Sequence, residues 1–197
     1  MEEILRHIFG WVCGQYPAHT WSPGGELLPL CQRCTGVYVG AFLAALLHVA
    51  HRPAPTPRWL WLNGAFLFFM VPSAAHWIPQ NPELRCASGI LCGAGLVAFL
   101  WLTLPENYFC RSRREEAQIK IKNQSAPPHA GSYKTFAAGL LAVLVLTPLL
   151  AENGNAIAAG ILVFASIGGA LALAVLLLAN LFFLLRAFAR RNATITA

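Results

Sequence analysis

Residues 156–185 read AIAAGILVFASIGGALALAVLLLANLFFLL, a run of thirty residues without a charged side chain. A transmembrane helix needs about 20 apolar residues, so this run is longer than one crossing requires but too short for two. It predicts one helix that is tilted or protrudes from the membrane. The composition agrees, because 57% of the 197 residues are hydrophobic and 11% are charged, whereas soluble domains carry about 25% charged residues. An ordinary water-soluble globular domain is therefore excluded.

Four further apolar runs are also of a length that predicts membrane crossings. They cover residues 34–49, 59–77, 86–104 and 135–150. Prolines, charged residues or tryptophans flank these runs, as is typical of membrane boundaries. We therefore expect an all-α fold, a polytopic integral membrane protein with about five transmembrane helices and an extracytoplasmic, Cys-rich N-terminal segment.

The runs divide the chain into four parts. A Cys/His segment with a short interfacial amphipathic helix near residues 4–12 comes first, because that apolar stretch is too short to cross a bilayer. Three transmembrane helices that complete a site follow, then a basic cytoplasmic loop, and finally two more transmembrane helices with a basic tail. The expected boundaries of these parts are 1–33, 34–104, 105–134 and 135–197.

The basic residues orient the predicted helices. Of the 14 Lys and Arg residues, all but Arg6, Arg33 and Arg85 fall on one side, and short cytoplasmic loops carry such an excess. We expect a multi-pass protein of a bacterial inner membrane, with its N-terminus outside and its C-terminus in the cytoplasm. The net charge of +6 then reflects topology, so membrane lipids and not nucleic acid are the expected partners. The oligomeric state stays open.

The cysteines gather on the predicted outer side. Cys31 and Cys34 form a Cys-x-x-Cys pair, which can supply two ligands of a zinc site. Cys13 would be a third ligand, with His19 or His76 as the fourth. Arg33 and Arg85 would offset the thiolate charge or bind an anion. A site with an open position could act on a lipid-soluble substrate at the outer leaflet.

Two other interpretations of the cysteines remain open. The first is a membrane thiol oxidoreductase, in which Cys31 and Cys34 exchange electrons with Cys13 or Cys86 and a membrane quinone is the cofactor. The second is a non-enzymatic scaffold in which the site, or a disulfide in an oxidising compartment, fastens the outer segment to the helices. The sequence does not decide whether the protein is an enzyme.

Two glycine pairs bear on where this site forms. Gly36 and Gly40, and Gly89 and Gly93, have the Gly-x-x-x-Gly spacing that permits close helix contact. If the first and third spans meet there, Arg85 and the following cysteine come near the Cys-x-x-Cys pair.

The stretches Cys13–Trp21 and Leu28–Gly40 resemble a bacterial family of small polytopic membrane proteins known as a domain of unknown function. The family pattern is Cys-His-Gln-x-Pro-x-Arg-Ser-Phe, then Leu-Pro-x-Cys-x-Arg-Cys-x-Gly-x-Tyr-x-Gly. A later element, Asn-x-x-Leu-Arg-x-x-x-Gly, is similar to residues 81–89, so the resemblance covers residues 13–95. Gly14 replaces the family His and His19 replaces the first Arg. Either His19 supplies the missing imidazole, or the site has lost a ligand and is only structural. The resemblance implies a fold and a site, and no reaction.

Overall fold

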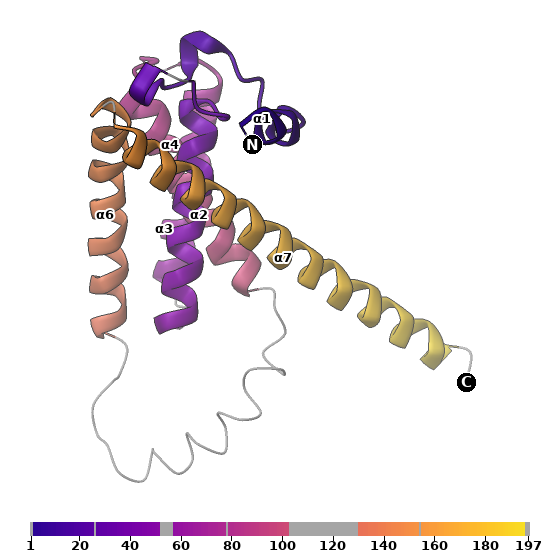
Figure 1. Cartoon of the computed structure of the whole chain (residues 1–197). Coiled ribbons are helices and arrows are strands. Elements are labelled where there is room, and N and C mark those ends of the chain that lie inside the picture. Colours follow the sequence, from indigo (N-terminus) through magenta and orange to yellow (C-terminus); the bar gives the residue numbers. More distant parts are fainter. Residues whose placement is uncertain are drawn as a thin grey trace.

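The computed structural model describes residues 2–25, 27–51, 57–77, 79–102, 130–153 and 155–195. Over these ranges the regular elements are all helices (Figure 1). Cys110 and most of the predicted cytoplasmic loop lie outside the described residues. The elements are α1 (Glu2–Gly10), the 3-10 helices η1 (Pro17–His19) and η2 (Pro23–Gly25), α2 (Gln32–His51), α3 (Pro57–Ala74), α4 (Pro82–Leu102), α6 (Ala130–Glu152) and α7 (Ala156–Ile195).

The all-helical, polytopic fold predicted from the sequence is confirmed, with one difference in the helix count. Helices α2, α3, α4, α6 and α7 coincide with the five predicted spans. In the described part of the chain, however, four helices are long and apolar enough to cross a membrane, and α3 is not among them. Arg58, Asn63 and Pro72 make α3 less apolar, and it has 18 residues.

Helices α2 and α4 form the most extensive contact in the bundle. Their glycines face one another so closely that an added Cβ atom at any of the four would overlap the backbone of the opposite helix. The predicted close approach of these two helices is thereby confirmed. The glycines concerned are Gly36, Gly40, Gly89 and Gly93.

Helix α7 crosses the other helices obliquely, and its C-terminal end extends away from them (Figure 1). It is one continuous helix of 40 residues, which agrees with the expected single long crossing. Asn155 begins it, because its side-chain oxygen accepts a hydrogen bond from the Ile157 amide at 3.1 Å. Farther along, the Asn180 amide donates to the Leu100 carbonyl of α4 at 2.9 Å, which fixes where α7 passes α4.

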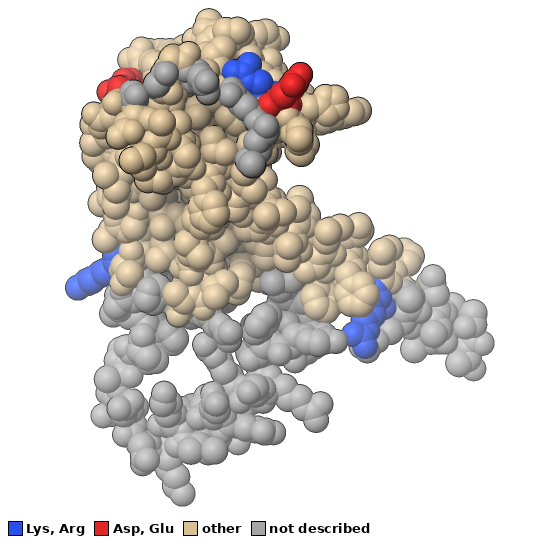
Figure 2. All heavy atoms as spheres, viewed as in Figure 1, with Lys and Arg blue, Asp and Glu red and all other residues tan. Residues whose placement is uncertain are grey.

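The surface has the polarity of a membrane protein. Among the described residues visible in Figure 2, charged side chains lie near the upper and lower ends, with an uncharged surface between them. Large apolar side chains are exposed on the helices, including Trp61, Phe68, Phe164 and Leu178. So much exposed apolar surface indicates a lipid environment.

The N-terminal segment folds back over the start of α2. Its α1 helix is short, as expected for an interfacial helix, and Phe9 packs on Tyr38 with ring centroids 5.7 Å apart. Gln15 fastens the segment, since its amide donates to the carbonyls of Arg6 at 2.7 Å and Pro29 at 2.9 Å.

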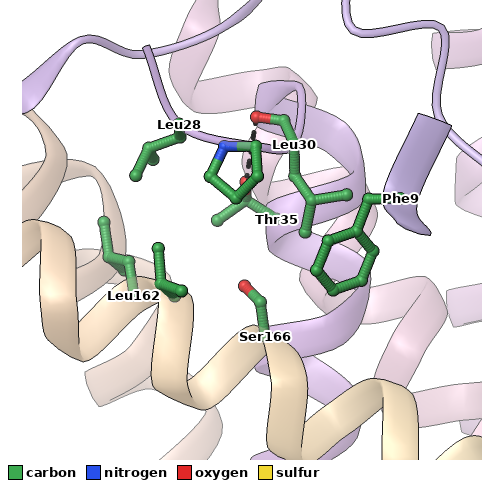
Figure 3. Close-up of a pocket in the computed structure, with 8 residues that line it drawn as sticks. Phe9, Leu28, Leu30, Thr35, Leu162 and Ser166 are labelled. Carbon is green, nitrogen blue, oxygen red and sulfur yellow. Dashed lines mark hydrogen bonds between the residues drawn. The ribbon is translucent and has the colours of Figure 1, made fainter. Parts of the chain in front are cut away.

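An apolar seam joins this segment to α7. Figure 3 shows side chains of the N-terminal segment facing Leu162 and Ser166 of α7, and the Thr35 hydroxyl donating to the Leu30 carbonyl. The gap between them has no room for a water molecule. The segment thus rests on α2 and α7 together.

Candidate metal centre

Cys31 and Cys34 occupy the first turn of α2. The Thr35 amide donates to the Cys31 carbonyl at 2.9 Å, which makes Cys31 the residue that caps the helix and places Cys34 in its first turn. The unpaired amides of a helix start carry partial positive charge, which favours anionic side chains there. This end of α2 therefore favours negative charge on the nearby sulfur atoms.

Cys13 brings a third sulfur to this turn. The sulfur atoms of Cys13, Cys31 and Cys34 all lie within 4.8 Å of one another and could hold a metal ion. The Cys13 amide donates to the Phe9 carbonyl at 2.9 Å, and the Cys31 amide donates to the Cys13 sulfur at 3.3 Å. Sulfurs about 3.8 Å apart would fit tetrahedral zinc with Zn–S bonds of about 2.3 Å, and separations of at most 4.8 Å are compatible with that arrangement.

The environment of Cys13 favours its thiolate form. Hydrogen bonds from the Cys31 and Cys34 thiols lower the pKa of Cys13 well below its usual value, and the Cys31 amide acts in the same direction. Burial opposes this shift and is the smaller effect. A thiolate is the form of cysteine that binds metal and attacks disulfides.

The sulfur cluster opens into a cavity of about 440 Å³. His19, at the end of η1, and His76, just after α3, both line this cavity. Neither belongs to the compact group of potential metal ligands found among the described residues, which contains only the three sulfurs. His76 has the left-handed backbone conformation, with a φ of 60°, and the Trp77 amide donates to the Pro72 carbonyl at 3.0 Å around it. This turn ends α3 and places His76 at the cavity.

Two arginines from different helices face the same cavity. Arg33 comes from α2 and Arg85 from α4, and both line the cavity with the cysteines. The Gln80 side-chain oxygen accepts hydrogen bonds from both guanidinium groups, at 3.4 Å from Arg33 and 3.0 Å from Arg85. Arg33 also donates to the Ser73 carbonyl at 2.7 Å. These bonds hold the two cations side by side at the cavity wall.

The polar residues that fix the arginines were not singled out from the sequence. Ser73 ends α3, and its hydroxyl accepts a hydrogen bond from Ser88 of α4 at 3.0 Å. Both serines are buried. Gln80 and Ser88 lie within five residues of Arg85, which was a local signal for contacts with that arginine, but nothing local indicated the contacts with Arg33.

The remaining outer cysteine lies elsewhere. Cys86 is buried in the main apolar core, where its carbonyl faces Gly36, and it does not line the cavity. The five cysteines within the described ranges are all free thiols.

Comparison with known proteins supports the resemblance seen in the sequence. A family described as "Predicted membrane protein (DUF2085)" matches residues 13–99. An uncharacterized protein of Methanothermobacter thermautotrophicus is 32% identical over 92 residues, which cover 45% of this chain and 83% of that protein. The chain belongs to the DUF2085 family. No solved structure matches it.

The DUF2085 match has a clear structural counterpart. It runs from Cys13 almost to the end of α4 and includes every residue that lines the cavity except Val12. Helices α6 and α7 lie beyond it. The part of the chain shared with the family is therefore the part that builds the cysteine cluster and its cavity.

Proposed function

We propose that this protein is a multi-pass membrane protein that binds one zinc ion through Cys13, Cys31 and Cys34. The observation that carries the proposal is the cluster of three sulfurs within 4.8 Å. The cluster joins residues 18 positions apart, at the start of a helix that favours thiolates. Three cysteine ligands and one further position are a recurrent zinc arrangement.

The fourth position faces the cavity. His19 and His76 both line it, and either imidazole would close the site as a structural one. With water in that position, the site would be open, and zinc would lower the pKa of the bound water or polarise a substrate group. The cavity volume of about 440 Å³ is in the range of small-molecule sites, and a lipid-soluble substrate at the outer leaflet is our proposal for an open site.

The location of the site follows from the charge distribution. We assign the cluster to the outer face of the inner membrane, with the C-terminus in the cytoplasm, because the sequence places most Lys and Arg residues in the segments that connect or follow the opposite ends of the predicted spans. Arg33 and Arg85 are exceptions to this distribution. We attribute their place on the outer side to a role beside the cysteines, with which they line the cavity. They offset the negative charge of the thiolates.

Metal analysis of the detergent-purified protein tests this proposal. We expect about one zinc per chain, retained after dialysis against metal-free buffer. Cys31→Ser and Cys34→Ser should each lose most of it, because two sulfurs form a much weaker site. Cys92→Ser is the matched control, since this half-buried cysteine of α4 lies outside the cluster and its replacement should leave the zinc content unchanged.

The same samples distinguish the redox alternative. A protein without zinc, whose Cys31 and Cys34 are found both as thiols and as a disulfide when alkylated before and after reduction, would contradict the metal proposal. Reduction of an added quinone by the dithiol form would then establish the oxidoreductase. A permanently oxidised pair would indicate a structural disulfide.

A further inference from the structure

We propose that Arg33 and Arg85 form a binding site for a phosphate-type oxyanion in the same cavity as the cysteine cluster. This inference rests on the proposed metal function, because it assigns the ligand class of that cavity. Both arginines line the cavity, on helices whose close approach the glycines permit. Arginine presents a planar array of donors that matches phosphate and carboxylate oxygens.

The hydrogen-bond partners of the two arginines are neutral groups. No carboxylate is found among the described residues that line the cavity, and the hydrogen bonds of both side chains go to neutral oxygens of Ser73 and Gln80. Arg85 is 6% exposed, and the buried Nε atom of Arg33 has no hydrogen-bond partner among the described residues. Buried charges whose hydrogen bonds go only to neutral groups are costly, so an anionic ligand, in addition to the thiolates, would stabilise this arrangement.

The net charge of the metal cluster and the two arginines agrees with an anionic ligand. Three thiolates around a divalent cation carry a net charge of minus one, and the two guanidinium groups carry plus two. One positive charge is therefore left for the cavity to bind. The cavity also has Tyr16 and Met70 on its walls, so part of the ligand beyond its anionic group can be apolar.

The anion could be a lipid headgroup or free phosphate, and two probes distinguish these sources. Inorganic phosphate is titrated into the full-length protein in neutral detergent by calorimetry. Phosphatidylglycerol and phosphatidylcholine are compared as adducts by native mass spectrometry. Phosphatidylglycerol should bind more tightly, because the choline cation of the other lipid is repelled by two arginines. Binding of phosphatidylglycerol alone assigns a headgroup, whereas binding of phosphate alone assigns a soluble ion.

Matched variants show whether Arg33 and Arg85 are responsible for anion binding. Arg33→Gln and Arg85→Gln should each weaken anion binding about tenfold or more, which corresponds to about 1.4 kcal/mol. Arg58→Gln, an exposed arginine at the start of α3, should change nothing. Since Arg33 also links α2 to α3, Arg33→Lys and Arg85→Lys serve as milder replacements that keep the charge. They should bind the anion more weakly than the wild type, because the planar array of donors is lost.

Zinc content measured on the same samples keeps the two proposals separate. Absence of anion binding with full zinc content overturns the anion site and leaves the metal site standing. Binding that is equally strong in all arginine variants also overturns it. Arginine-dependent binding in protein that contains no zinc, including Cys31→Ser, would support the anion site and refute the metal site.

Discussion

At the scale of single residues, Cys13 decides what kind of site this is. Cys31 and Cys34 lie three positions apart and would come together in any helix, whereas Cys13 reaches them only because the N-terminal segment folds back. Gln15 holds that fold, with bonds of 2.7 and 2.9 Å to two carbonyls. A pair of thiols suits redox exchange, but a third sulfur at the same place suits metal binding.

The ionisation of Cys13 gives a prediction for the metal-free protein. Because its neighbours lower the pKa, the thiolate should persist as the pH falls from about 8 to about 5, whereas an ordinary cysteine with a pKa of about 8.5 is protonated there. Its contribution to stability is full above the unfolded pKa of about 8.5, decreases as the pH falls below that value, and is gone once the pH is below the lowered pKa. The measurement is the ultraviolet thiolate absorption of the wild type minus that of Cys13→Ala. A difference that vanishes below about pH 8 would contradict the lowered pKa.

At the scale of helices, the contact between α2 and α4 is the foundation of the site. The cysteine pair and Arg33 lie at the start of α2, and Arg85 lies at the facing end of α4. Glycines let the two backbones approach closely, and larger residues would force them apart. The geometry of the site therefore depends on residues that never touch it.

A pair of alanine variants tests this dependence. Gly40→Ala places a methyl group against the Ile90 backbone, and overpacking of this kind should lower the free energy of unfolding by about 1–3 kcal/mol. Gly160→Ala in α7 has open space around it and should raise the free energy by about 0.5–1 kcal/mol, because alanine favours helices. Thermal unfolding in detergent measures both. Equal effects of the two variants would show that the close contact is unimportant.

The sequence predicted these elements well because hydrophobic length and glycine spacing are local signals. It predicted α3 as a membrane span, and α3 is a helix of 18 residues, but Arg58 and Asn63 make it less apolar than the four helices that are long and apolar enough to cross a membrane. It also missed the contacts of Ser73 and Gln80 with Arg33. Those contacts depend on how the end of α3 turns toward α4, which no local pattern in the sequence specifies.

At the scale of the whole molecule, topology determines which compartment the site meets. With the N-terminus outside, an alkaline phosphatase fused after residue 197 should be inactive, because that enzyme folds only in an oxidising compartment. A fusion of green fluorescent protein at the same position should fluoresce. High phosphatase activity would overturn the orientation and place the cysteines in the reducing cytoplasm.

The oblique course of α7 has a consequence for the membrane itself. Its apolar part, Ala156–Arg186, has 31 residues and is about 46 Å long, against a hydrocarbon core of about 30 Å. The apolar parts of α2, α4 and α6, with 19 to 21 residues, match that core without a steep tilt. Since the C-terminal end of α7 extends away from the other helices (Figure 1), we expect the protein to occupy more area on that side of the membrane than on the other.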